Sequence, residues 1–587
     1  MIRAFYDHVA EFRRAICRCA QGSVALIGAL SIIALVGMGA FAVEASAGYS
    51  TKVSNQRIAD MAALAGALAY NVASDQTAMT ATAKAVVTAQ GLAASTAAVA
   101  LVTDAATSKQ LVQVTITTTV PLSLGRVLTT DTGFDVISVG MATTTTPSTA
   151  PPCIAALSST VSNGISMTGT TALNAAGCAI NTNAGISLPY SSTTITAKEV
   201  NAGKAISGST WITTTPTANK VAQNKANAAS DWASGITALK AALCQVNQLT
   251  GTSDADYPDG NTICANPLVS PNSIGTTDLN LNYSPSASLA VYFNSSNNTY
   301  TIPYSWISAN YPGGKIKNLN ISGGITAYLQ GPLTLDINLI SMGGTALHIG
   351  SGNISIAGNI VLNGGAVVDF DIGTGNTVTI GNVSGTSINA GGGAKICFTL
   401  NCTAPSAAAG TFSTSGDIIT SGGSTIIFPR AMTHVINGNL SLNGSSTFGS
   451  GTYIIKGNFT NNTGGTMSGS DISFALGGTF TLTGGTSLDL AAPSSTSSYG
   501  IPDVLVATKS TAATTIGGGS ANKYGGLVYA PKSALSISGG SSVSSNAAGC
   551  LMMIVSTITM SGGTSATSTC TGLTGSASST ASVGLFK

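Results

Sequence analysis

One short pattern recurs through the C-terminal half of the sequence: apolar, polar, apolar, polar and then, in most copies, a glycine. Strand side chains alternate between two faces, so both apolar residues of a copy share one face. The glycine that follows permits a sharp turn with positive φ. Copies begin at Leu319, Ile354, Leu440, Phe480, Leu535 and Ile558, and a degenerate copy begins at Phe459.

Neighbouring copies start about 20 residues apart, as from Leu440 to Phe459 and on to Phe480. One copy cannot bury its own apolar pair, but stacked copies can. The pattern therefore predicts a right-handed parallel β-helix over residues 311–570, with Leu, Ile, Val and Phe inside and Ser, Thr and Asn outside. Because the period drifts, a β-sandwich is the alternative architecture.

An uncharged run of 20 residues, Val24 to Val43, lies near the N-terminus. As a helix it would span about 30 Å, the thickness of the hydrocarbon core of a bilayer. Four arginines and two acidic residues precede it, and this basic excess favours a cytoplasmic N-terminus. We expect one transmembrane helix with the membrane as its partner. A signal peptide cleaved near Ala45-Ser46-Ala47 is the alternative, although the apolar part of signal peptides usually runs about 7–15 residues.

Composition and periodicity divide the chain into six segments. Residues 78–90 have a helical pattern, and the stretches 111–120 and 134–141 alternate as half-buried strands do. The chain is expected to be mainly β with an N-terminal α segment. The segments are a cytoplasmic head (1–22), the transmembrane helix and helical stalk (23–70), a small α+β module (71–150), a disulfide-stapled β segment with a helical insertion at 221–247 (151–310), the β-helix solenoid (311–570) and a flexible tail (571–587).

The chain is poor in charge: 7% of its residues are charged, against about 25% in an average globular protein. Nucleic acid is therefore not an expected partner, because phosphate binding needs clustered Lys and Arg. Disordered chains are poor in β-branched residues, whereas this chain is rich in Val, Ile and Thr. The composition is typical of a strand-rich protein with a polar surface.

The ten cysteines divide at the apolar run. Cys17 and Cys19 precede it and are expected to remain thiols. The eight that follow form an even set, which in an oxidising compartment indicates disulfides. Sequence does not fix the connectivity, but neighbouring cysteines lie close in the chain. The expected pairs are Cys153–Cys178, Cys244–Cys264, Cys397–Cys402 and Cys550–Cys570, and free buried thiols are the alternative.

Two stretches near the N-terminus carry a family resemblance. The first is Gly22-Ser23-Val24-Ala25, which opens the apolar helix, and the second is residues 55–65, NQRIADMAALA. Together they resemble the N-terminal segment of TadG-like proteins, which belong to the tight-adherence (Flp-type) pilus assembly systems of bacteria. The Cys-to-Cys segment 153–178 and the C-terminal copies of the repeat extend this resemblance.

Pilin-like members of these systems carry Glu at the fifth position after the cleavage point. Counted from Ser23, that position is Ile27 in this sequence. The resemblance therefore implies a membrane-anchored accessory protein and not a polymerising pilin. It also implies other pilus-assembly proteins as partners.

Candidate catalytic residues are few. Parallel β-helices often carry polysaccharide lyases and hydrolases, whose sites need clustered carboxylates. Asp369 and Asp371 are the best pair, since residues i and i+2 of a strand share a face. No further acidic residue lies near them in sequence, so we interpret them as two solvated carboxylates on an outer face.

The histidines are His8, His348 and His434. The last two lack Asp, Glu or Cys at metal-ligand spacing, and we interpret them as residues at the surface or at the edge of a repeat. No catalytic, cofactor-binding or metal-binding residue is expected from them.

Two further features are candidate ligand sites. The glycine runs 391–393 and 517–519 lack the strand–loop–helix context of a phosphate loop. The three residues Asp254, Asp256 and Asp259 could hold a cation, but their spacing is not that of a Ca²⁺ loop. A solvated turn is the favoured interpretation of these aspartates.

The sequence thus predicts a non-enzymatic, single-pass protein of the bacterial inner membrane, with a cytoplasmic N-terminus and its bulk periplasmic or exposed at the cell surface. By its resemblance to TadG-like proteins it would act in pilus assembly or adhesion, with surface glycans as further candidate partners. The alternative is a polysaccharide-degrading β-helix enzyme. Three or more carboxylates in one groove would favour the enzyme, whereas ladders of Ser, Thr and Asn would favour the scaffold.

Overall fold

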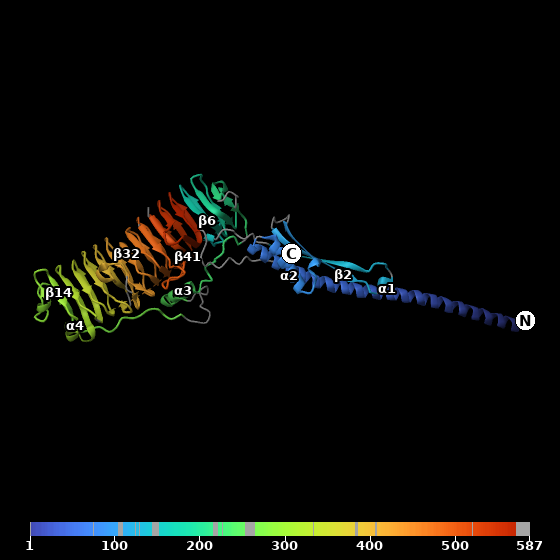
Figure 1. Ribbon diagram of the computed structural model, residues 1–587, viewed down its shortest axis with the longest axis horizontal. Coiled ribbons are helices and arrows are strands. Elements are labelled where there is room, and N and C mark those ends of the chain that lie inside the picture. Colours follow the sequence, from blue (N-terminus) through green and yellow to red (C-terminus); the bar gives the residue numbers. More distant parts are fainter. Residues whose placement is uncertain are drawn as a thin grey trace. The chain divides into compact units, whose positions relative to one another are not determined.

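The computed structural model (Figure 1) divides into two compact units, one within residues 1–149 and one within residues 150–577. The residues that it describes are 2–73, 75–103, 110–123, 125–127, 129–143, 152–214, 221–225, 227–252, 264–332, 334–381, 385–405, 408–485, 487–518 and 521–570. The predicted tail, 571–587, lies outside them.

The first unit is built on α1 (Ile2–Ala73), which packs against an antiparallel sheet of three strands. Gly140 permits this close approach, because a Cβ there would lie 2.4 Å from the carbonyl carbon of Ala59 in α1. The helix expected at 78–90 and the two expected strands are confirmed. The elements after α1 are α2 (Gln76–Ala89), β1 (Ala97–Thr103), β2 (Gln110–Pro121) and β3 (Gly133–Thr143).

The N-terminal part of α1 is apolar and exposed. Its large side chains between Ile27 and Val43 are about half to three-quarters exposed, and Phe41 reaches 75%. The helix is long and apolar enough to cross a membrane, a property that a signal sequence shares. Glu44 follows this run, and its Oε1 accepts hydrogen bonds from the backbone N–H groups of Ser123 (2.9 Å) and Gly125 (2.7 Å). The loop between β2 and β3 is thereby fixed to α1 where the apolar run ends.

Over its described residues, the second unit contains a 39-stranded, mostly parallel sheet of short strands, and its architecture is β-helix-like. β31 (Leu440–Leu442), β34 (Phe459–Asn461) and β37 (Phe480–Leu482) illustrate the pairing, since Leu440, Phe459 and Phe480 are aligned across them. This parallel pairing differs from the antiparallel sheets of a β-sandwich.

The apolar residues of the repeat point into the core, as predicted. Each is at most 2% exposed in every copy of the pattern. The buried pairs are Leu319 and Ile321, Ile354 and Ile356, Leu440 and Leu442, Phe480 and Leu482, Leu535 and Ile537, and Ile558 and Met560.

Strands from the two ends of this unit lie side by side. β4 (Pro152–Ala156) pairs in parallel with β43 (Leu551–Ser561), and β6 (Ala172–Thr182) and β8 (Thr194–Ala202) continue the sheet beyond β4. Figure 1 shows β6 beside the red C-terminal strands. Strands within residues 152–222, expected in a separate stapled segment, therefore belong to the same sheet as the repeats.

A long connection then carries the chain to the opposite end of the sheet. α3 (Thr237–Thr250) packs beside β33 (Gly451–Ile455) and β36 (Ile472–Leu476). Residues 264–278 follow the outside of the sheet, where the backbone N–H of Asn272 donates to Ser355 Oγ at 2.7 Å. The chain re-enters at β12 (Leu279–Leu281), which pairs with β15 (Lys315–Ile321), and from there the repeats return toward β43 (Figure 1).

The helical insertion is shorter than the predicted 221–247. α3 begins at Thr237, while residues 221–222 form strand β11 (Val221–Ala222). Asp231 Oδ1 accepts from the backbone N–H groups of Ala233 (3.2 Å) and Ser234 (3.0 Å). A local turn of this kind competes with helix formation, so the apolar spacing around Trp232 does not become helix.

Four disulfides join the second unit, and they are the near-neighbour pairs expected from the sequence. The long apolar helix and these disulfides indicate a secreted or membrane-anchored extracytoplasmic protein. The disulfides are Cys153–Cys178, Cys244–Cys264, Cys397–Cys402 and Cys550–Cys570.

Candidate functional site

Four side chains line up on the outer face of neighbouring parallel strands. Their sequence neighbours toward the core are fully buried, so these four point outward. The aligned residues are Tyr328 of β16 (Thr326–Leu329), His348 of β18 (Ala346–Ile349), Asp369 of β21 (Val367–Phe370) and Cys397 of β24 (Lys395–Cys397).

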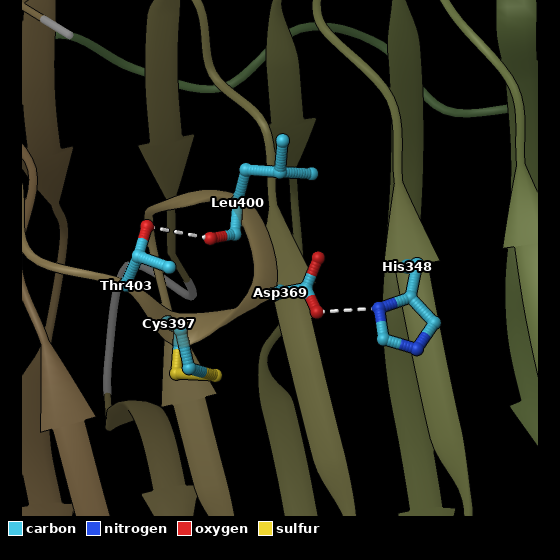
Figure 2. Close-up of polar contacts among 6 residues, drawn as sticks. His348, Asp369, Cys397, Leu400 and Thr403 are labelled. Atoms are coloured by element: carbon cyan, nitrogen blue, oxygen red, sulfur yellow. Dashed lines mark hydrogen bonds and ion pairs between the residues drawn. A yellow bond between two sulfur atoms is a disulfide. The ribbon is translucent and has the colours of Figure 1, made fainter. Parts of the chain in front are cut away.

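His348 and Asp369 form the polar centre of this row. The Nδ1 atom of His348 lies 2.5 Å from Asp369 Oδ2 (Figure 2). The ring of Tyr328 stacks on the other side of the imidazole, with centroids 4.5 Å apart and planes at 13°. The side chain of His348 is 21% exposed and that of Asp369 is 1% exposed.

A disulfide-closed loop accounts for the burial of Asp369. Cys397 is bonded to Cys402, and the short helix η6 (Leu400–Cys402) lies against β21 and β24. Thr403 Oγ1 donates to the carbonyl of Leu400 at 2.8 Å, and Figure 2 shows this loop beside the carboxylate. The second carboxylate oxygen of Asp369, Oδ1, is buried without a hydrogen-bond partner.

This row can position an imidazole. A carboxylate bound to one ring nitrogen fixes the ring orientation and leaves the other nitrogen to carry a proton or meet a ligand. The described residues contain no group of three or more His, Cys, Asp or Glu side chains that could hold a metal ion. With its oriented imidazole, the row offers hydrogen bonding or proton exchange beside an exposed tyrosine.

The interpretation of Asp369 and Asp371 as two solvated carboxylates is wrong for Asp369. Asp369 is buried and bonded to His348, whereas Asp371 lies half-buried just beyond the end of β21. His348 and Asp369 are aligned because of the register between two strands 21 residues apart. No local sequence motif predicts that register.

The interpretation of His434 as a surface or edge residue is also wrong. His434 lies in β30 (Thr433–Ile436), is fully buried, and is aligned with Phe412 and Tyr453. Its Nε2 lies 2.8 Å from the carbonyl of Pro429, and its ring stacks on Tyr453 with centroids 3.9 Å apart. Burial lowers the pKa of His434 to about 4.

Other sequence candidates take structural places or lie outside the described residues. Gly391–Gly393 forms the turn between β23 (Thr386–Ala390) and β24, with positive φ at Gly392 and Gly393. His348 is partly exposed on the outer face, as expected for a surface residue. The aspartates 254, 256 and 259 lie outside the described residues, as do the side chains of His8, Cys17, Cys19 and Val24.

Polar ladders run along the turns of the parallel sheet. Asp417 Oδ1 accepts from the backbone N–H of Asn439 (2.6 Å), Asn439 Oδ1 accepts from Asn458 N–H (2.9 Å), and Asn458 Oδ1 accepts from Thr479 N–H (2.8 Å). Each side chain thus bonds the next turn of the chain. These are the ladders that the sequence analysis associated with a scaffold.

Comparison of the chain with protein-family models, with curated proteins and with solved structures finds no match.

Proposed function

We propose that this chain is a membrane-anchored, surface-exposed and non-enzymatic protein of a bacterial tight-adherence pilus system, acting in pilus assembly or in adhesion. The observation that carries the proposal is the joining of an exposed apolar helix run, 27–43, to a large disulfide-bonded stack of parallel strands. The resemblance of residues 22–25 and 55–65 to TadG-like proteins supplies the pilus context.

The stack is, in this proposal, a right-handed parallel β-helix that serves as a spacer and a binding surface. Inward apolar pairs and outward Asn and Thr ladders support this role. A repeated polar surface suits many weak contacts made together, and surface glycans or other pilus-assembly proteins are partners of the matching chemistry.

Deletion of the gene separates assembly from adhesion. A role in assembly predicts a strain without pili by electron microscopy, whereas a role in adhesion predicts normal pili with reduced attachment to surfaces. Complementation with the full chain should restore the lost property. A deletion strain with normal pili and normal attachment would contradict both roles.

One observation favours the enzyme alternative. His348 is oriented by Asp369 and partly exposed, an arrangement that suits proton transfer. Incubation of the purified full chain with a panel of bacterial and host polysaccharides tests it, by counting new reducing ends and unsaturated uronates. We expect no turnover. Turnover that disappears in both His348→Ala and Asp369→Asn would establish the enzyme instead.

A further inference from the structure

Three polar side chains meet at the edge of the sheet formed by the first strands of the second unit. Asn201 and Glu199 lie in β8, and Lys225 follows β11, which pairs in parallel with the end of β8. Asn201 is 2% exposed, although it points away from the core. Glu199 and Lys225 are half-buried.

Both polar atoms of the Asn201 carboxamide, Nδ2 and Oδ1, are hydrogen-bonded. Its Nδ2 donates to Glu199 Oε1 at 2.8 Å and to Asn181 Oδ1 at 3.0 Å. Its Oδ1 accepts from Lys225 Nζ at 3.1 Å. Two acceptors at Nδ2 and one donor at Oδ1 fix the orientation of the amide.

Lys225 is also fixed through its backbone, because its N–H donates to the carbonyl of Ala202 at 2.9 Å. The Lys225 backbone is therefore fixed beside Ala202, the residue that follows Asn201. From there its side-chain amine reaches the Asn201 amide. This is the arrangement of a nucleophile, an acyl group and a carboxylate positioned beside the leaving nitrogen.

A covering segment, residues 227–236, lies on the outer face of the sheet beside this site. The backbone N–H of Ala229 donates to Asn183 Oδ1 at 2.8 Å, and Tyr529 OH donates to Asp231 Oδ2 at 2.8 Å. Ala229 and Ala233 are buried against the sheet. The segment is thus fixed to the outer face next to Asn183, two residues after the Asn181 side chain that binds Asn201.

We propose that Lys225 and Asn201 form an intramolecular isopeptide bond, with Glu199 as the proton-transfer group. Lys225 Nζ, neutral after losing one proton to water, attacks Asn201 Cγ and forms the new C–N bond. Glu199 takes a proton from the attacking nitrogen and delivers one to Nδ2. The Cγ–Nδ2 bond then breaks and ammonia leaves, so that no electrons are exchanged and no co-reactant is needed.

The bond closes the loop from 201 to 225, which holds the shortest strands at this edge. These are β9 (Ile206–Ser207), β10 (Ile212–Thr214) and β11, and the four disulfides lie elsewhere in the chain. Short strands bury little surface, and covalent closure restricts the unfolded loop as a disulfide does. The bond thereby ties the covering segment to the edge of the sheet.

Peptide mass spectrometry of the full chain tests this bond. Trypsin does not cleave after an acylated lysine, so a digest should contain residues 199–204 joined through Asn201 to residues 221–240. The branched peptide should weigh one ammonia less than its two parts. Recovery of 199–204 and 221–225 as separate, unmodified peptides overturns the proposal.

Matched variants separate the chemistry from the fold. Lys225→Arg keeps a cationic donor but removes the nucleophile, so the branched peptide should disappear. Lys204→Arg alters a neighbouring lysine that contacts Val161 O, and the bond should remain. Glu199→Gln should reduce the joined fraction at least tenfold in freshly made protein. A branched peptide in Lys225→Arg, or an unchanged fraction in Glu199→Gln, contradicts the assigned roles.

Discussion

Among single residues, His434 is the buried group whose titration the fold most clearly controls. It is aligned with Phe412 and Tyr453 in a row of inward rings, where its Nδ1 has no hydrogen-bond partner. The same row continues into Phe474, whose ring is tilted by 38° to that of Tyr453, with centroids 5.1 Å apart. A neutral imidazole behaves here as one more flat ring of the core, whereas a charged one would be buried without an anion.

The buried His434 should make stability fall in acid. Its pKa drops from 6.5 in the unfolded chain to about 4 in the folded one, so the unfolded state binds the extra proton between these values. The free energy of unfolding should therefore decrease as pH falls from about 6.5 to 4, by about 3 kcal/mol in total. Urea unfolding of the wild type and of His434→Phe, compared over this pH range, measures the difference. Parallel pH profiles for the two proteins would contradict the assignment.

Leu442 and Ser441 test the inward and outward register at adjacent positions. Leu442 is fully buried in β31, whereas Ser441 is partly exposed and contacts Thr460 Oγ1 at 3.0 Å. Leu442→Asp buries an unpaired charge and should cost about 3 kcal/mol or more, while Ser441→Asp should cost well under about 1 kcal/mol. Thermal melting in detergent gives both values. A Leu442→Asp protein that melts like wild type would place this side chain in solvent.

At the scale of elements, the boundary between the apolar run of α1 and the packed part of the first unit is set by Glu44. The large apolar side chains before it are exposed, whereas Glu44 is 9% exposed. Two backbone N–H groups of the β2–β3 loop depend on it as an acceptor. The exposed apolar run of α1 thus ends at the residue that binds the β2–β3 loop.

Replacing Glu44 by Ala should destabilise the first unit by about 1–3 kcal/mol, because two backbone donors lose their acceptor. Glu44→Gln retains an acceptor oxygen and should cost less than half as much. The rates of hydrogen exchange at the Ser123 and Gly125 amides measure the loss of these two hydrogen bonds directly. Equal protection of these amides in wild type and Glu44→Ala would contradict the role of the carboxylate.

Local sequence patterns predicted most helices and strands, but they could not predict which strands distant in sequence pair with one another. Alternation gave β2, β3 and the strands of the repeat, because side-chain period is a local property. The helix expected over 221–247 begins only at Thr237, because the Asp231 turn competes with helix formation before it. Within the candidate site, Asp369 was identified from its residue type, but its bond to His348 requires knowing which strands are neighbours.

At the scale of the whole second unit, the pairing of its first strands with its last strands is the feature that sequence could not indicate. Ala155 pairs with Ile554, nearly 400 residues later, and no period connects them. The chain places its first strands against its last, then returns along the outside through residues 264–278. Because both chain ends of the unit meet at one place, the end of the repeat is covered by strands and is not left as a free edge.

The central claim is that one membrane-spanning helix tethers a disulfide-bonded, extracytoplasmic stack. Labelling of cysteines in intact spheroplasts with a membrane-impermeant maleimide tests it most directly. We predict no label on intact spheroplasts without reductant, and labelling of Cys17 and Cys19 once the membrane is permeabilised, still without reductant. The eight cysteines from Cys153 to Cys570 should be labelled only after subsequent denaturation and reduction. Labelling of Cys17 or Cys19 from outside, their absence from the mature chain, or eight free thiols without reductant would contradict the account.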